Sequence, residues 1–232
     1  MYKHLMTNPE LSRLVADLTS DGHLQIQGHR YISSFYSKDR SEIKEFEQRF
    51  YKLFKVKGKI YEDKRPVGKN PNPIIRYQAF FISKPVNLFL KNIGVPSGDK
   101  TNSPFLIPDW IINGSKKIKS SYLRGLYDAE GSIFCGKDKR WQITLKMAKN
   151  KVLLKEGIAF FEQIRKILLE FDVKTSTINY SKLNIRKDGS TSVYLRIAIE
   201  RSSFGNFLKH VGFDNKSKQE KLLISLGPWQ SG

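Results

Sequence analysis

The chain has 232 residues, and its 41 lysines and arginines against 22 aspartates and glutamates give a formal charge of +19. It has no apolar run of about 18 residues and only one cysteine, Cys135, which excludes a transmembrane helix, an internal disulfide and a cysteine-rich zinc site. The basic residues are spread along the chain, which favours nucleic acid over a membrane surface as the polyanionic partner. The N-terminus lacks the apolar run of a signal peptide, so we expect an intracellular protein of the cytoplasm or nucleoid.

The first half of the chain opens with a helix that ends in LVADLTSDG, residues 14–22. Alternating polar and apolar residues over 23–37 predict two strands with a turn near Gly28, and helical spacing predicts a helix over 41–54. KIYEDKR and IIRYQAFFIS predict a second hairpin, joined by a loop over 66–73. A short helix over 85–92 follows, with Ser83 as its cap and Gly94 as its stop.

The second half repeats this order, beginning with LRGLYDAEG at residues 123–131. A strand is expected over 141–147, a helix over 154–168, and a hairpin from LNIRK and SVYLRIAI around Asp188-Gly189. FLKHVG at 207–212 matches FLKNIG at 89–94 with an offset of 207 − 89 = 118 residues. We therefore predict an α+β fold of two pseudo-symmetric αββαββα units, each with a four-stranded antiparallel sheet. The units cover residues 1–102 and 120–232, with a linker over 103–119; halves that share periodicities by chance are the alternative.

Each motif helix carries two small residues four positions apart, on one helix face. Small residues let helices approach closely, so we expect the two motif helices to pack together and to bring Asp21 and Glu130 near each other. Two carboxylates at helix C-termini repel, and a hard divalent cation such as Mg²⁺ relieves the conflict. One copy alone favours a capped core helix, whereas two copies at equivalent places favour a metal site. The helix-interface residues are Ala16, Ser20, Gly125 and Ala129.

Both segments resemble the motif of the LAGLIDADG homing endonucleases, and the second matches it closely, with Glu130 in place of the last Asp. The resemblance runs from about residue 11 to residue 226. It implies a saddle of two sheets on DNA, with the motif helices at the interface of the two halves. It also implies a monomer with an internal pseudo-two-fold axis that hydrolyses both DNA strands in a long pseudo-palindromic site and leaves short 3′ overhangs. The chain begins with Met1 and ends in QSG, so it resembles a free-standing, intron-encoded enzyme more than an intein.

The resemblance further implies a set of active-site residues. Asp21 and Glu130 become the metal-binding carboxylates, beside backbone oxygens of Ser20 and Ala129. Mg²⁺ is the expected cofactor, Mn²⁺ an expected substitute, and Ca²⁺ is expected to support binding without cleavage. Asp17 and Thr19 depart from the motif in the first copy, which leaves open whether both halves cut equally. The implied catalytic residues are Asp21, Glu130, Lys100, Lys216 and Lys146, with Tyr36 as the first-half counterpart of Lys146.

Strand alternation predicts one core face and one open polar face on each sheet. The core face is expected to hold Leu24, Ile26, Ile143, Leu145, Leu183, Ile185, Leu195 and Ile197. The open face carries side chains that suit base edges in the major groove of DNA, although simple solvation is the alternative at each position. The expected DNA-binding residues are Gln25, Gln27, His29, Tyr36, Arg76, Gln78, Gln142, Thr144, Lys182, Asn184, Arg186, Ser192, Tyr194 and Arg196.

Two other functions stay open on the sequence. The first is a maturase that binds intron RNA, although the deep, narrow major groove of RNA suits extended sheets poorly. Binding of intron RNA without cleavage of duplex DNA would indicate it. The second is a catalytically inactive, sequence-specific DNA-binding protein, which specific binding without cleavage in Mg²⁺ would indicate.

Overall fold

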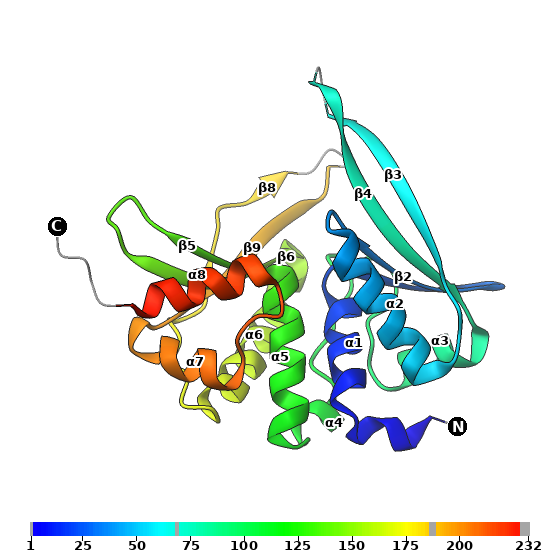
Figure 1. The fold of residues 1–232 in the computed structure, drawn as a ribbon, viewed down its shortest axis with the longest axis horizontal. Helices are drawn as coiled ribbons and strands as arrows, with labels where there is room; N and C mark the ends of the chain where they lie inside the picture. The colour runs from blue at the N-terminus through cyan, green and yellow to red at the C-terminus, as the bar shows by residue number, and fades with distance from the viewer. Residues whose placement is uncertain (1, 68–69, 186–188, 228–232) are drawn as a thin grey trace. The chain divides into compact units, whose positions relative to one another are not determined.

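The computed structural model describes residues 2–67, 70–185 and 189–227 (Figure 1). The chain divides into two compact units, Met1–Gly98 and Asp99–Gly232, and each unit is described by itself. Within the described ranges, no helix combines the length and the apolar character that crossing a membrane requires.

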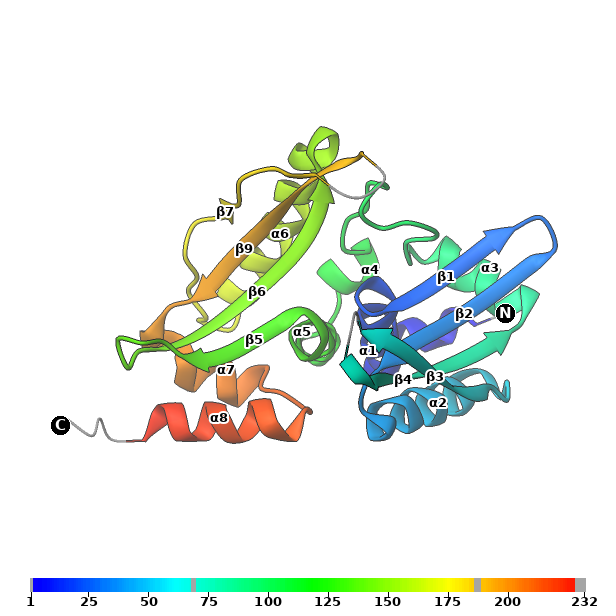
Figure 2. The ribbon, with the colours of Figure 1, turned by 90° about the horizontal axis from the view of Figure 1, so that it is seen from above.

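The first unit is a four-stranded antiparallel sheet packed against three α-helices. Its strands run in the order β1-β2-β4-β3 (Figure 2). The predicted αββαββα order is confirmed for this unit. Its elements are η1 (Lys3–Thr7), α1 (Pro9–Thr19), β1 (Gly22–Gln27), β2 (Arg30–Ser37), α2 (Arg40–Phe54), β3 (Lys59–Val67), β4 (Asn70–Ile82) and α3 (Lys84–Asn92).

Aromatic side chains fill the space between α2 and this sheet. Phe46 stacks on Phe35 with 4.7 Å between ring centroids, and Phe50 stacks on Phe81 at 4.0 Å. Phe46 and Phe50 lie four residues apart and so share one face of α2. All four rings are buried, and each contributes roughly 1.5–3 kcal/mol to folding by leaving water. The predicted helix over 41–54 is therefore confirmed, with its apolar face on the sheet.

The second unit is a five-stranded antiparallel sheet with α-helices packed around it. The strand order is β5-β6-β9-β7, and β8 also pairs with β9. Residues 103–119, predicted as a linker, include α4 and the first turn of α5, and the Ile107 amide donates a hydrogen bond to Gln163 Oε1 at 2.8 Å. The elements are α4 (Asp109–Ile112), α5 (Lys116–Glu130), β5 (Gly131–Cys135), β6 (Trp141–Asn150), η2 (Lys151–Leu153), α6 (Leu154–Leu169), β7 (Asn179–Tyr180), β8 (Asn184–Ile185), β9 (Thr191–Ile199), η3 (Arg201–Ser203), α7 (Phe204–His210) and α8 (Lys216–Leu226).

In both sheets the motif glycine is the first residue of the first strand and pairs with a buried residue of the second strand. Gly22 pairs with Phe35 on β2, and Gly131 pairs with Leu145 on β6. On the last strand, the partners of Phe35 and Leu145 lie 197 − 79 = 118 residues apart, the offset that the sequence repeat has. The 118-residue offset of the repeat is thus confirmed on the last strand of each sheet. Those last-strand partners are Ala79 and Ile197.

The second hairpin of each unit differs from its prediction. In the first unit the expected loop over 66–73 is wrong, because β3 continues to Val67 and β4 begins at Asn70. In the second unit β8 (Asn184–Ile185) is the described part of the expected strand over 183–187, and a further short strand, β7 (Asn179–Tyr180), precedes it, so the sheet has five strands rather than four. Asp188 lies outside the described residues, and Gly189 has φ +79°, the left-handed conformation that tight turns favour.

The predicted core positions Leu183 and Ile185 are also wrong. Leu183 is 49% exposed and Ile185 is 75% exposed. Ile185 lies on the short strand β8, which pairs with β9, and Leu183 precedes that strand. Alternation over so few residues does not fix which face points inward. The other predicted core residues lie in the interior, with Ile26 only half-buried.

Candidate active site

Asp21 follows directly on the C-terminal end of α1. The helix ends at Thr19, and the hydroxyl of its C-cap Ser20 donates to the carbonyl oxygen of Ala16 at 2.8 Å. Asp21 is exposed. The end of a helix carries a partial negative charge, so a carboxylate at this place is favoured when a cation binds beside it.

Asp17, the first departure from the motif, belongs to an ion-pair network inside the first unit. Its two carboxylate oxygens contact Arg13 Nε at 3.0 Å and Arg49 Nη1 at 2.8 Å, and Arg49 Nε also contacts Glu10 at 3.1 Å. Asp17 is buried. The second departure, Thr19, donates a hydrogen bond to the carbonyl oxygen of Val15 at 2.7 Å. Both departures therefore have structural roles within the unit that holds α1.

Glu130 is the last residue of α5, and the motif glycine follows it at once. A Cβ atom at Gly131 would lie 2.3 Å from the carbonyl oxygen of Tyr127, and one at Gly22 would lie 2.8 Å from that of Asp17. No real Cβ tolerates such a contact, so glycine is required for the strand to start directly at the helix end. In both units the motif thereby holds its carboxylate at the junction of a helix and the first strand.

Lys218, a residue of α8, binds the C-terminal end of α5. Its ammonium donates to the carbonyl oxygens of Gly131 at 2.7 Å and Tyr127 at 3.3 Å, and also to that of Asp128. A cation at a helix C-terminus offsets the partial negative charge there, directly beside Glu130. The predicted residue Lys216 is instead the exposed first residue of α8.

The repeat offset in the sequence points to Lys218, whereas the similarity of two short segments points to Lys216. Lys218 lies 218 − 100 = 118 residues after Lys100, which is the offset of the repeat. Aligning the halves by this offset pairs Lys100 with Lys218, whereas matching the short segments GDKTN and DNKSK pairs it with Lys216.

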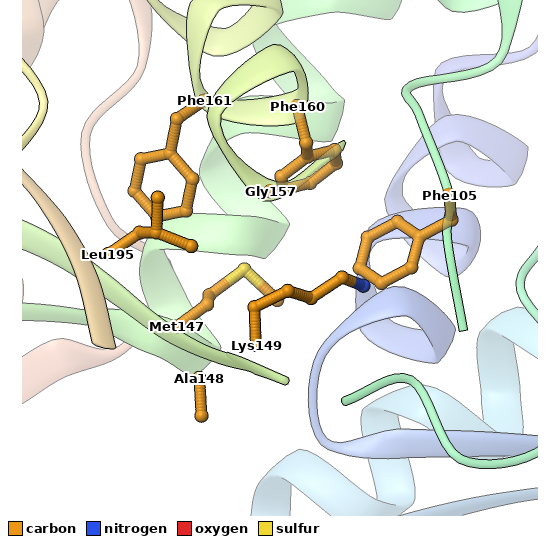
Figure 3. A pocket seen from close by; sticks show the side chains of 8 residues that line it. All are labelled: Phe105, Met147, Ala148, Lys149, Gly157, Phe160, Phe161 and Leu195. Carbon is orange, nitrogen blue, oxygen red and sulfur yellow. The ribbon is translucent and has the colours of Figure 1, made fainter. Parts of the chain in front are cut away.

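Lys149 anchors the segment that carries Lys100. Its ammonium donates to the carbonyl oxygens of Lys100 at 2.7 Å and Ser103 at 2.6 Å, and lies 3.8 Å from the ring centroid of Phe105. Figure 3 shows this side chain reaching Phe105 along a small pocket whose lining is otherwise apolar. Burial lowers the pKa of Lys149 to about 8, with Glu156 and Asp99 acting in the opposite direction.

The lowered pKa of Lys149 predicts a rise in stability at alkaline pH. Between about pH 8 and its ordinary pKa of 10.5, the unfolded chain binds this proton while the folded chain does not, so the free energy of unfolding increases with pH. The gain is at most about 3 kcal/mol, since one pKa unit corresponds to about 1.4 kcal/mol. Urea unfolding at pH 7 and pH 10 should show this rise in the parent but not in Lys149→Met. Lys146→Met, which alters an exposed lysine on the same strand, should keep it.

The open faces of the two sheets carry related aromatic and cationic pairs. In the first unit the Arg76 guanidinium lies 4.6 Å from the centroid of the Tyr36 ring, and Gln78 Nε2 donates to Tyr36 Oη at 3.0 Å. In the second unit Lys146 Nζ lies 4.1 Å from the centroid of the Tyr194 ring. In the shared register Tyr36 corresponds to Lys146 and Arg76 to Tyr194, so the pair recurs with its strands exchanged. The predicted catalytic residue Lys146 thus lies on the open sheet face.

Other predicted DNA-binding residues also lie at accessible positions. Arg196 Nη2 donates to Gln142 Oε1 at 2.9 Å, on the open face of the second sheet. In the first unit Gln25 is half-buried and Gln27 is exposed on β1, while His29 lies in the exposed turn between β1 and β2. Asn184 is exposed on β8.

Some of the predicted DNA-binding residues are shielded from solvent or lie outside the strands. Thr144 and Ser192 are buried at 5% and 1% exposure, because each has a short side chain flanked by paired strands on both sides. Lys182 is exposed but lies between β7 and β8 rather than in a strand. Arg186 lies outside the described residues.

The donor set of the predicted metal site suits a hard cation. Asp21, Glu130 and the backbone oxygens of Ser20 and Ala129 supply only oxygen atoms, which Mg²⁺ prefers. In the described parts of the chain, no three His, Cys, Asp or Glu side chains converge on one point; the predicted site takes one carboxylate from each unit. Burial raises the pKa of Tyr127, which favours the neutral form of this phenol.

The helix-interface residues are largely shielded from solvent. Ala16, Ser20 and Gly125 are buried and Ala129 is half-buried. The packing of α1 on α5 is a prediction, because the two helices belong to different units. The proximity of Asp21 to Glu130 depends on that packing and is a prediction as well.

Comparison with known proteins finds a family match over the second copy of the motif. Residues 117–212 match the family model described as "LAGLIDADG-like domain". Residues 117–212 are a LAGLIDADG-like domain. The fold of this chain is similar to that of the homing endonuclease I-WcaI bound to its DNA recognition sequence, with a TM-score of 0.55, 13% identity, and coverage of 92% of this chain and 85% of that one. It is also similar to the N-terminal LAGLIDADG domain of DUF199/WhiA, with a TM-score of 0.50, 13% identity, and coverage of 92% and 86%.

The curated relatives are much longer than the match. The chain is 28% identical to a tRNA-splicing ligase RtcB of Methanopyrus kandleri, over 91% of this chain but 22% of the relative. It is 26% identical to a glutamine--fructose-6-phosphate aminotransferase of Methanocaldococcus jannaschii, over 92% of this chain and 17% of the relative. It is 29% identical to a replication factor C small subunit of the same organism, over 86% of this chain and 10% of the relative. The chain thus spans about a fifth or less of each.

Proposed function

We propose that this LAGLIDADG-like protein is a site-specific, Mg²⁺-dependent endonuclease that hydrolyses both strands of duplex DNA. The duplicated helix end, with Asp21-Gly22 in one unit and Glu130-Gly131 in the other, carries this proposal. Each carboxylate directly precedes a sheet with a polar open face, on a chain of charge +19. Two carboxylates, together with two sheet faces that can contact bases, suit a substrate that has two strands and two half-sites.

The open sheet faces support DNA as the substrate. Arg76, Gln78, Gln142 and Arg196 are side-chain types that bind purine edges in the major groove, and a pair of β-strands fits that groove. Their cross-strand contacts hold several of them in place, which lowers the entropy cost of binding. The likeness of fold to an endonuclease bound to its DNA recognition sequence supports the same reading.

The range of relatives supports a portable, self-contained unit. A ligase, an aminotransferase and a replication factor subunit share no named activity, yet each matches nearly the whole of this chain over a minor part of its own length. A unit common to such proteins does not perform the activity that names any of them. An endonuclease that acts on the DNA of the locus where its own coding sequence resides explains this distribution.

In the proposed site, Asp21, Glu130 and the backbone oxygens of Ser20 and Ala129 hold the cation. Bound Mg²⁺ would supply activation of water and charge stabilisation for the departing 3′ oxygen. Lys218 reduces the negative charge at the end of α5, which favours approach of a phosphodiester. We further propose a monomer that cuts a long pseudo-palindromic site to short 3′ overhangs, one strand per half.

Selection from a randomised duplex library tests this proposal. Incubation in Mg²⁺, followed by sequencing of the cleaved ends, should yield one enriched site with short 3′ overhangs, and EDTA should abolish cleavage. Enrichment by binding without cleavage in Mg²⁺ would contradict the proposal and indicate an inactive DNA-binding protein. Binding of intron RNA with neither DNA binding nor cleavage would indicate a maturase.

A further inference from the structure

We propose that Asp128 is a positioning residue that holds the connector between α7 and α8, so that Lys218 reaches the carbonyl oxygens at the end of α5. The effect on cleavage rests on the proposed function. The positioning itself rests only on contacts within the second unit, which can be measured without DNA.

Two polar side chains on α5, one and two helical turns before Asp128, bind the end of α7 and the start of this connector. The Ser120 hydroxyl donates to the carbonyl oxygen of His210. Arg124 Nε donates to the carbonyl oxygen of Val211 at 2.6 Å, and its Nη1 lies 3.5 Å from Asp214 Oδ1. Ser120, Arg124 and Asp128 follow each other at four-residue spacing, so they form one polar stripe on the helix.

Asp128 completes the stripe at the point where α8 begins. Its carboxylate accepts hydrogen bonds from the backbone amide of Asp214 at 3.1 and 3.2 Å and from that of Asn215 at 3.1 Å. Bonds from amides to a carboxylate are charge-assisted and stronger than neutral ones. Asn215 is the N-cap of α8, and its Oδ1 accepts from the backbone amide of Lys218 at 3.1 Å. Asp128 therefore holds the backbone of Asn215, and Asn215 in turn holds the backbone of Lys218.

The contacts form a closed cycle between two helices. Asp128 of α5 holds the start of α8, and Lys218 of α8 holds the end of α5 through the carbonyl oxygens of Tyr127, Asp128 and Gly131. Figure 1 shows the start of α8 beside the C-terminal end of α5. A lysine side chain has several rotatable bonds, so a fixed backbone is needed for its ammonium to stay beside Glu130. In the first unit the corresponding residue, Thr19, donates within its own helix instead.

A double-mutant cycle tests whether Asp128 acts through Lys218. In the parent, Asp128→Ala should slow DNA cleavage by about 30-fold, whereas in Lys218→Met it should change the rate by less than about 3-fold, because coupled residues are not additive. Asp128→Asn keeps an oxygen for the two amides and should restore most of the rate. Asp138→Ala, at an exposed aspartate in the turn between β5 and β6, is the matched control and should cut like the parent. Equal losses in both backgrounds would overturn the proposal.

A second measurement needs no DNA. In Asp128→Ala, hydrogen exchange at the amides of Asp214 and Asn215 should accelerate by about 10-fold or more, since their acceptor is lost. The ammonium signal of Lys218 in ¹H–¹⁵N spectra, assigned by its loss in Lys218→Met, should broaden or shift; Asp128→Ser serves if the alanine variant does not fold. An unchanged ammonium signal overturns the positioning even if the protein cuts DNA. If these two changes occur but the parent protein does not cut DNA, the positioning role of Asp128 is upheld and only the proposed function is refuted.

Discussion

Glu130→Gln is expected to reduce the rate of DNA cleavage by about 10³-fold, because loss of a metal-binding carboxylate removes roughly 4 kcal/mol of transition-state stabilisation. Asp21→Asn should have a comparable effect. Glutamine and asparagine keep the size of the parent side chains, and both positions lie at helix ends rather than in a core. The free energy of unfolding and the affinity for the duplex should therefore change little. Single-turnover cleavage and DNA binding in Ca²⁺ measure the two quantities separately.

Glu162→Gln provides the matched control for these variants. Glu162 lies on α6, where its carboxylate pairs with Arg165 at 2.9 Å and is 44% exposed. It carries the same change of charge as Glu130→Gln at a place away from the motif, and it should cut like the parent. Parent-like cleavage by Glu130→Gln and Asp21→Asn would remove both residues from the active site.

Asp17→Leu is expected to lower the free energy of unfolding by about 3 kcal/mol, although leucine agrees better with the motif than aspartate does. The change leaves Arg13 and Arg49 largely buried, at 12% side-chain exposure each, without their shared carboxylate. Removing one partner of such a network costs more than removing both, because a largely buried charge then loses a carboxylate that offsets its desolvation. Asp17→Leu combined with Arg49→Met should therefore recover much of the loss. Urea unfolding followed by circular dichroism measures both variants.

An exposed ion pair gives the control for Asp17. Glu162→Ala breaks the pair with Arg165 and should cost less than about 0.5 kcal/mol, since surface pairs contribute little. If Asp17→Leu costs no more than Glu162→Ala, the network around Asp17 does not stabilise the first unit.

The repeat made much of the fold predictable from the sequence. Helical spacing located α2 and α6, and the 118-residue offset between the FLK segments holds along the last strands of both sheets. The requirement for glycine after each carboxylate is also a local property, because the clash at Gly22 and Gly131 involves only the preceding helix turn. Local rules suffice where both partners of an interaction lie a few residues apart.

Long-range contacts account for what the sequence did not predict. Asp17 looked like a defect in the motif because its partner Arg49 lies 32 residues away on another helix. Lys218 was missed because its carbonyl partners lie about 90 residues earlier, and α8 has only a weakly apolar face to mark it as a packed helix. The burial of Thr144 and Ser192 depends on which strands flank them, a property of the assembled sheet.

Strand-resolved cleavage of the selected duplex by the parent and by the Asp21→Asn, Glu130→Gln double variant is the most direct measurement of whether these two carboxylates hold the catalytic cation. The parent should cut both strands in Mg²⁺ and neither strand in Ca²⁺, while binding the duplex in both. The double variant should bind with similar affinity and cut neither strand. Cleavage of either strand by the double variant at the parent's rate, or cleavage by the parent in EDTA, would contradict a metal-dependent site built on Asp21 and Glu130.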